Sequence, residues 1–561
     1  MFNKILKLFL ILCIFYQSPL YSKSVSFNNF NSKDLSNYFS GIIAFENKNN
    51  FKALKFFNSS KILINNHDPY LERYVTTLVL EKKVNEAINV IKKNEGKKNT
   101  NFFDAYLLLI LDSLKKNDFE KAYLDIKEAF IFAKQDRFNS AILETLQQYI
   151  YVFKEKKLID GNKKYGSLSL ISETFQRCYL DDPKTENYFL NLINKTEVDY
   201  TRYIYFYLSY LVSKNKFEDT KKVVADINYI NSTLLLSQGK SWIERSSFKK
   251  FQNVFFCKDH LHVMGEFLFL ISNLYSSQDN YEKSNYYLYL SNFLNPKFVY
   301  NLSLISENYY LNKNYEMSKK ILKNFDKEDD LYFWYRKKKE AQIISQKKNK
   351  QKSLKFIQSE FDKIDKPNNK MIFDLANFYK NAKNYDIAIK YYSIIIENLN
   401  ENSEIKSDLL YRRGGSYERK GDYINADKDL LSSLSIDPDD AYVLNYLAYS
   451  WLERNFKIEE AIEMLKTAYD LRSDDPYIID SIGWAYYLVE EYFKAEEFLK
   501  RAVELMPDDP IVNDHYGDIL WKLDQKIQAR YFWNNVLKME DVEIEMIDEI
   551  NSKLIRGPKN S

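Results

Sequence analysis

Along most of this chain, apolar residues recur every three or four positions among polar ones, which is the spacing of amphipathic helices. Short polar turns separate these stretches. Residues recurring every three or four positions share one face of a helix. The segment 476–506, PYIIDSIGWAYYLVEEYFKAEEFLKRAVELM, shows the pattern most clearly and predicts a pair of helices. Only 12 glycines and 10 prolines occur in 561 residues, fewer than a sheet with many tight turns needs. The pattern therefore predicts an all-α protein.

The predicted helix pairs repeat in the C-terminal part of the chain. The residues that recur thirty-four positions apart are Pro476 and Pro510, Gly483 and Gly517, and Ala495 and Ala529. Gly414, Ala426 and Pro438 stand at the same internal offsets as Gly483, Ala495 and Pro507. Small residues allow two antiparallel helices to cross closely, and a proline ends the second helix. In the unit that begins at Ala441, Ala461 arrives one residue late, which predicts a one-residue insertion in the turn.

These positions closely resemble the tetratricopeptide repeat (TPR) family, whose pattern is W-x2-L-G-x2-Y, then A-x3-F, then P. The resemblance implies a right-handed α-solenoid of antiparallel helix pairs. Well-matched repeats cover 401–540, divergent repeats 261–400, and a degenerate TPR-like helical region 23–260, where Phe119 and Phe217 mark second helices. Residues 541–561 hold an amphipathic helix and a tail. A solenoid needs such a helix to cap its last exposed face.

The first residues have the layout of a secretory signal peptide. Lys4 and Lys7 precede an apolar run from Leu8 to Tyr16, and a small residue follows at Ser22. We expect cleavage after about residue 22, which would leave a periplasmic or secreted protein. Association of this protein with the outer membrane is part of the expectation. An uncleaved anchor is one alternative. A lipoprotein is the other, although Leu12 before Cys13 does not fit a lipidation box.

Two cysteines, Cys178 and Cys257, remain after the signal segment. An even number in an oxidising compartment is compatible with a disulfide, and two buried thiols are the alternative.

Charge gives no sign of nucleic-acid binding, because 81 basic and 78 acidic residues leave a net charge of only +3. The charge is nevertheless uneven. Residues 441–510 carry fifteen acidic and seven basic side chains, whereas 336–355 carry nine basic and one acidic. The basic stretch is either a solvated helix pair or a patch for an anionic partner.

Catalytic motifs do not emerge from the sequence. The segment SQGKS at 237–241 has the Gly-Lys-Ser of a phosphate-binding loop, but Leu234 stands where the first glycine belongs. His260 and His262 lie near Cys257 and Asp259 without a familiar zinc spacing, so we favour a structural turn over a metal site. The sequence contains neither HExxH nor GxSxG. We therefore predict no enzymatic activity, no metal and no cofactor.

The TPR resemblance also implies a binding surface. In that family the first helix of each pair lines a concave groove, and four positions of each unit point into it. Aromatic side chains beside polar groups suit peptide binding. Counted from Ser407, Ala441, Pro476 and Pro510, the predicted groove residues are Tyr411, Asn445, Tyr449, Asp480, Trp484, Tyr487, Asp514, Asp518 and Trp521.

The segment 442–523 also resembles the C-terminal half of proteobacterial envelope TPR proteins, some of which act as adaptors that deliver substrates to a carboxyl-terminal-processing protease. This resemblance implies a non-catalytic scaffold or adaptor of the bacterial cell envelope that binds proteins or peptides in its groove and presents them to a periplasmic protease. Peripheral association with an envelope membrane complex is part of this expectation. The alternative is a structural or assembly component of an envelope export or outer-membrane complex.

Overall fold

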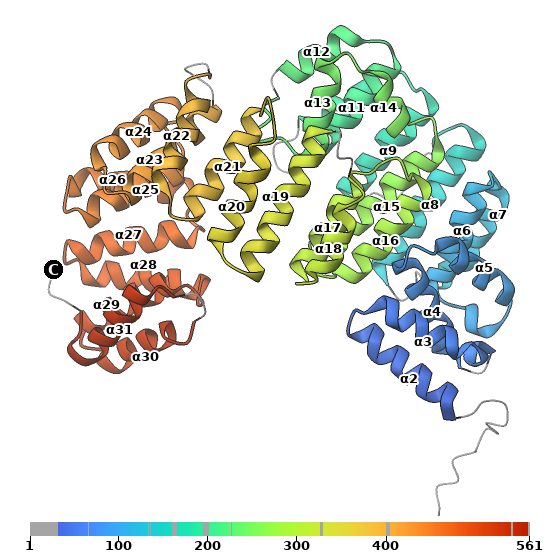
Figure 1. Cartoon of the computed structure of the whole chain (residues 1–561), viewed down its shortest axis with the longest axis horizontal. Helices are drawn as coiled ribbons and strands as arrows, with labels where there is room; N and C mark the ends of the chain where they lie inside the picture. The colour runs from blue at the N-terminus through green and yellow to red at the C-terminus, as the bar shows by residue number, and fades with distance from the viewer. Residues whose placement is uncertain are drawn as a thin grey trace, which may run out of the picture. The chain divides into compact units, whose positions relative to one another are not determined.

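The computed structural model describes residues 32–65, 67–132, 134, 136–159, 165–194, 201–225, 227–325, 329–399, 404–539 and 542–558. Every regular element among them is a helix, so the predicted all-α array of helix pairs is confirmed (Figure 1). The chain divides into two compact units, one made of residues up to 226 with 234–326, the other of 227–233 with 327–561. The predicted signal peptide and Cys13 lie outside the described residues.

The first unit holds α2 to α18. Their bounds are α2 (Ser32–Glu46), α3 (Asn50–Ser59), α4 (Asp68–Leu80), α5 (Val84–Asn94), α6 (Phe103–Lys115), α7 (Phe119–Ala129), α8 (Arg137–Glu155), α9 (Ser167–Leu180), α10 (Thr185–Ile193), α11 (Thr201–Ser213), α12 (Phe217–Ala225), α13 (Leu234–Glu244), α14 (Lys249–Val254), α15 (His260–Ser276), α16 (Tyr281–Leu294), α17 (Asn301–Leu311) and α18 (Tyr315–Leu322). Phe119 and Phe217 begin α7 and α12, as the repeat predicted.

The second unit holds α19 to α31. Their bounds are α19 (Asp330–Lys347), α20 (Lys350–Phe361), α21 (Asn369–Asn381), α22 (Tyr385–Ile396), α23 (Glu404–Arg419), α24 (Tyr423–Ile436), α25 (Ala441–Glu453), α26 (Ile458–Leu471), α27 (Pro476–Leu488), α28 (Tyr492–Leu505), α29 (Pro510–Lys522), α30 (Lys526–Val536) and α31 (Ile544–Arg556). Each odd-numbered helix up to α29 pairs with the one that follows it, and successive pairs pack side by side.

Small residues set how closely the two helices of a pair approach. A Cβ added to Gly483 in α27 would lie 2.7 Å from Leu499 Cγ in α28, and one added to Gly517 in α29 would lie 2.4 Å from Trp533 Nε1 in α30. Ala495 on α28 is completely buried. Close-packed interiors leave no room for an extra methyl group at such contacts. The recurring glycine and alanine of the sequence are therefore the crossing points of the helix pairs.

The turns between repeats follow from their aspartate and proline residues. Asp475 and Asp509 are N-caps, and one carboxylate oxygen of each accepts two backbone N–H groups of the following helix at 2.9 to 3.3 Å. Proline occupies the next position, where a helix needs no N–H donor. In the unit with the predicted insertion, Asn455 and Lys457 have φ of 51° and 48°, and α26 begins at Ile458. The extra residue is thus absorbed in the turn.

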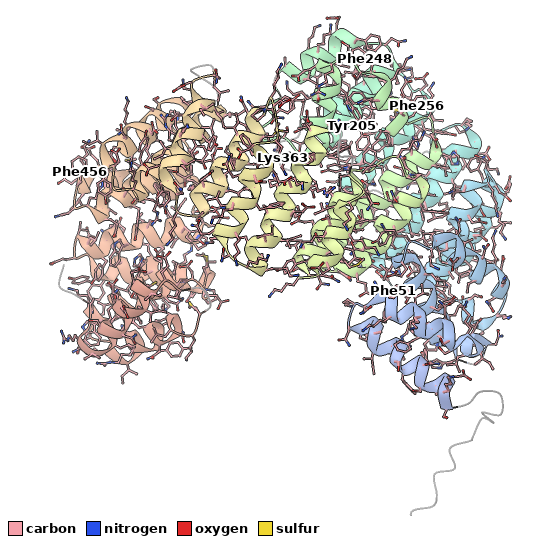
Figure 2. The ribbon with its side chains drawn as sticks, in the orientation of Figure 1. Phe51, Tyr205, Phe248, Phe256, Lys363 and Phe456 are labelled. Carbon is pink, nitrogen blue, oxygen red and sulfur yellow. A yellow bond between two sulfur atoms is a disulfide. The ribbon has the colours of Figure 1, made fainter. Side chains whose placement is uncertain are left out.

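A disulfide joins Cys178 on α9 to Cys257, three residues before α15, with their Cα atoms 5.8 Å apart. It links positions 79 residues apart in the first unit. Phe175 and Phe255, close to the two cysteines in sequence, pack edge-on with ring centroids 5.7 Å apart. Tyr205, labelled in Figure 2, belongs to the same unit and stacks on Phe251 with ring centroids 5.2 Å apart. The disulfide therefore links α9 covalently to the segment that precedes α15.

The last helix, α31, closes the array as the sequence predicted. Ile550 of α31 is completely buried in the core that α27 to α30 form, and Gly557 follows the last helical residue. Within the residues that the structure covers, no helix is long and apolar enough to cross a membrane.

Candidate functional site

The first helices of three consecutive repeats, α25, α27 and α29, carry most of the predicted site. They contact one another directly, α25 with α27 and α27 with α29. We call the surface formed by their predicted groove residues, with Glu453 and His515, the first-helix face. Residues at equivalent repeat positions lie next to each other on it, because the repeats stack with one register.

Aromatic rings form the centre of the first-helix face. The Trp484 ring is stacked on Tyr487 with centroids 4.6 Å apart and an interplanar angle of 9°, and on His515 of α29 at 4.1 Å and 13°. Trp484 Nε1 donates a hydrogen bond to Glu453 Oε1 of α25 at 3.0 Å. Tyr449 lies 6.5 Å from the His515 ring. Three helices thus contribute to one aromatic cluster.

Carboxylates surround this cluster. Asp480 Oδ2 lies 2.8 Å from His515 Nδ1, and both side chains are buried. Burial lowers the pKa of His515, but the neighbouring Asp480 and Asp514 outweigh this effect and raise it. Burial, together with Glu453 and Asp480, raises the pKa of Tyr449. The neighbouring carboxylates therefore favour the protonated form of His515.

Two acceptor atoms on the face have no hydrogen-bond partner. They are Asp480 Oδ1 and Asn445 Oδ1, and both atoms are buried. A buried acceptor without a donor is unfavourable, by about 1–3 kcal/mol. Asp480 and Asn445 occupy equivalent positions on neighbouring helices. In this part of the first-helix face, two acceptor oxygens therefore lack a hydrogen-bond donor.

The far end of the predicted site is in contact with the chain's own C-terminal helix. Lys553 Nζ of α31 lies 2.8 Å from both carboxylate oxygens of Asp514 and 3.0 Å from Asp518 Oδ2. A Cβ added to Gly557 would lie 2.4 Å from Trp521 Nε1. Asp514, Asp518 and Trp521 are thus engaged within the molecule.

The buried group of Lys553, Asp514 and Asp518 has one cation for two carboxylates. Burial raises the pKa of Asp518 to about 7, and Asp514 adds to the effect. Burial also raises the pKa of Asp514 more than Lys553 lowers it. Burial lowers the pKa of Lys553, yet the two carboxylates raise it to about 12. The lysine stays charged, and the carboxylates share extra affinity for a proton.

Tyr411, at the other end of the prediction, lies on α23. It packs edge-on against Tyr446 of α25, with ring centroids 5.6 Å apart. It borders the core that α24 to α27 form and is half-buried. Tyr411 therefore takes part in packing between repeats.

Sequence reasoning did not name several residues of this region. His515 carries no signal beyond its place directly after Asp514 in the helix that begins at Pro510. Tyr442, Tyr477 and Ile511 were also missed, although they share one repeat position and are 47%, 56% and 51% exposed. The available signal was their place, since each stands second in its unit, one of the four positions that the resemblance places in the groove.

The segments considered for catalytic chemistry are structural. Residues 237–241 lie inside α13. His260 Nε2 lies 2.9 Å from the Leu114 carbonyl oxygen, and His262 Nδ1 accepts the Phe256 N–H at 3.0 Å. Across the described ranges, no three His, Cys, Asp or Glu side chains are grouped to hold a metal ion.

Residues 407–440, which form α23 and α24, match the tetratricopeptide repeat family model. The crossing glycines and the capped turns of the neighbouring helix pairs follow the same pattern. The chain therefore contains tetratricopeptide repeats. Arrays of this kind are protein–protein interaction scaffolds.

The similar proteins cover different shares of the chain. The TPR repeat-containing protein PA4667 of Pseudomonas aeruginosa is 33% identical over 118 residues, which are 18% of this chain and 20% of that protein. The match thus spans about a fifth of that relative's length. A thermophilic TPR protein of Thermus thermophilus is 18% identical, covers 33% of this chain and 99% of its own, and gives a TM-score of 0.30. The Cut9–Hcn1 assembly of the APC/C is 13% identical over 93% of this chain and 97% of its own, with a TM-score of 0.38.

Proposed function

We propose that this TPR protein is a non-catalytic adaptor of the bacterial cell envelope, which holds partner proteins or peptides on the first-helix face and presents them to a periplasmic protease. The observation that carries the proposal is the cluster of Tyr449, Trp484 and Tyr487 among carboxylates on consecutive first helices. Aromatic anchors bordered by polar groups are typical of the centres of protein interfaces.

Two features support the envelope location. The first residues have the layout of a secretory signal peptide. The disulfide between Cys178 and Cys257 suits a compartment where disulfides persist. The link to a protease rests on the resemblance to envelope adaptor proteins. A processing protease needs its substrates brought close, and a rigid scaffold with one face for a substrate does this.

Affinity capture from envelope extract tests the proposal with two matched variants. Trp484→Ala removes the central ring of the aromatic cluster. Phe493→Ala removes an aromatic ring of α28 that is 85% exposed and lies outside the first-helix face. We expect a carboxyl-terminal-processing protease and its substrates with the wild type and with Phe493→Ala, and loss of the substrates with Trp484→Ala.

The other outcomes separate the rival functions. A fixed stoichiometric complex that both variants retain would indicate a structural or assembly component in place of an adaptor. Recovery of the protein in the cytoplasmic fraction with reduced cysteines would contradict the envelope location. Circular dichroism of each variant checks that the helices are intact.

A further inference from the structure

A second surface of the C-terminal repeats adjoins the first-helix face. It is formed by the three turns that lead from a second helix into the next first helix, residues 437–442, 470–477 and 504–511, which we call the turn edge. Large apolar side chains stand exposed along it. They are Tyr442, Leu471, Tyr477, Leu505 and Ile511, between 43% and 56% exposed.

The apolar side chains of the turn edge recur with the repeat. Leu471 and Leu505 end second helices thirty-four residues apart, and Tyr477 and Ile511 stand second in first helices at the same spacing. Because α25, α27 and α29 contact one another in order (Figure 1), the equivalent residues form a row across the repeats. A single exposed leucine is ordinary on a protein surface, but an ordered row of large apolar groups indicates a contact surface.

The same edge is strongly acidic. Its three segments carry nine carboxylates and one cation, Arg472. Arg501 reaches the edge from α28 and donates to the Ser473 carbonyl oxygen at 3.0 Å. Asp440, Asp475 and Asp509 cap helices, whereas the aspartates that precede them, Asp439, Asp474 and Asp508, are exposed and are not the caps. The exposed carboxylates therefore lie along the row of apolar side chains.

The adjoining first-helix face also lacks donors. Asp480, only 5% exposed, lies three residues after Tyr477 in α27, and its Oδ1 has no hydrogen-bond partner. Asn445 Oδ1 is unpartnered at the equivalent place beyond Tyr442. At the end of the array the chain fills a comparable place with its own lysine, Lys553, which lies between Asp514 and Asp518. The surface thus already accommodates one ammonium group.

We propose that the turn edge binds a basic amphipathic segment of a partner protein, whose apolar side chains cover the exposed row while its lysines or arginines face the aspartates. This inference rests on the proposed adaptor function and names the chemistry of the partner. An anionic membrane is repelled by the carboxylates, and so is the same edge of a second copy of the chain. A metal ion could bind the carboxylates, but it would not cover the row of exposed apolar side chains.

Fluorescence anisotropy with designed peptides tests the inference on the full-length protein. The probe is a helical peptide of lysine and leucine with the two residue types on opposite faces. Its comparisons are a version with glutamate for lysine, a version with serine for leucine, and vesicles of phosphatidylglycerol. We expect the lysine–leucine peptide to bind at least about tenfold more tightly than either altered peptide, because charge and apolar contact both contribute. We expect no binding to the vesicles.

Two triple variants locate the binding. Asp439→Asn/Asp474→Asn/Asp508→Asn removes exposed charges that are not the helix caps. Tyr442→Ser/Tyr477→Ser/Ile511→Ser removes three of the five large apolar side chains of the row. Each should weaken binding of the peptide by about tenfold or more. Ile424→Ser/Phe493→Ser/Ile527→Ser is the matched control, since these three side chains are 84% to 85% exposed on second helices. The control variant should bind as the wild type does.

Several results would overturn the inference. They are equal binding of the glutamate peptide, unchanged affinity of the asparagine variant, equal loss in the control variant, or stronger binding to the vesicles. If the serine variant unfolds, the asparagine variant still decides. Peptide binding at the turn edge without protease capture would refute the adaptor function alone. Capture that depends on Trp484 without peptide binding would refute the turn edge alone.

Discussion

Replacement of Gly517 by alanine tests whether the repeat glycine is a packing requirement. The new Cβ would lie 2.4 Å from Nε1 and 2.6 Å from Cδ1 of Trp533, a completely buried ring that donates to Asp518 Oδ1 at 3.2 Å. Either the ring or the helix must shift. Overpacking of this kind costs about 1–3 kcal/mol. The alanine gains about 0.5–1 kcal/mol in helix stability, so the variant should lose about 1–2 kcal/mol.

Gly415→Ala in α23 is the matched control. Its added Cβ would lie 3.3 Å from Tyr446 Oη, the far end of a half-buried side chain that can move aside. The same gain in helix propensity then acts with little opposing cost, so we expect this variant to be as stable as the wild type or up to about 1 kcal/mol more stable. The gap between the two variants isolates the packing cost.

Urea unfolding followed by tryptophan fluorescence measures this gap. The C-terminal repeats contain Trp451, Trp484, Trp521 and Trp533, four of the six tryptophans in the chain, so the signal reports mainly on them. Gly517→Ala should lower the midpoint of their transition, and Gly415→Ala should not. If Gly517→Ala were as stable as Gly415→Ala, the glycine would not be required by close packing, and the explanation of the repeat pattern would fail.

Three further predictions follow from buried groups. Lys553→Met leaves two buried carboxylates without a cation, which costs about 3 kcal/mol, so hydrogen exchange in α31 should accelerate, while Arg556→Met on the exposed side of α31 should exchange like the wild type. The pKa of Asp518 is raised to about 7 when folded, above the ordinary value of about 3.9, so protonation favours the folded state and this contribution is lost as pH rises from about 4 to 7. In the wild type, this group should lower the unfolding free energy by at most about 1.4 kcal/mol per pH unit over that range, and Asp518→Asn should abolish the decrease. The same dependence of unfolding free energy on pH in the wild type and the variant, measured by urea titration, would contradict the prediction. Opening the disulfide with Cys178→Ser/Cys257→Ser should cost the first unit about 2–5 kcal/mol and leave the C-terminal fluorescence transition unchanged, since the bond links two positions of that unit.

The repeat period located the C-terminal helix pairs well because each pair is held together locally. Gly483 meets Leu499 only sixteen positions later, and the intervening turn fixes the geometry. The aspartate caps and the extra residue before α26 could be predicted for the same reason, because both depend only on residues close in sequence. Upstream, Phe119 and Phe217 were enough to locate α7 and α12, although the surrounding pattern is weak.

The predicted groove residues were harder to interpret, because their environment depends on distant segments. The sequence placed Asp514, Asp518 and Trp521 on one face of a helix, but not opposite Lys553 and Gly557, which come more than thirty residues later. The sequence also did not show which of these positions stay open to a partner.

The sequence by itself determined the helices, their pairing and their caps, since these depend on residues within one thirty-four-residue unit. Only the tertiary structure decided which charges are neutralised inside the molecule. It joined His515 to Asp480 across two repeats and Cys178 to Cys257 across 79 residues. It also left Tyr477 and Ile511 uncovered beside their aspartates. The physical reason is that burial and charge pairing depend on the stacking of whole repeats, whereas helix formation depends on neighbours along the chain.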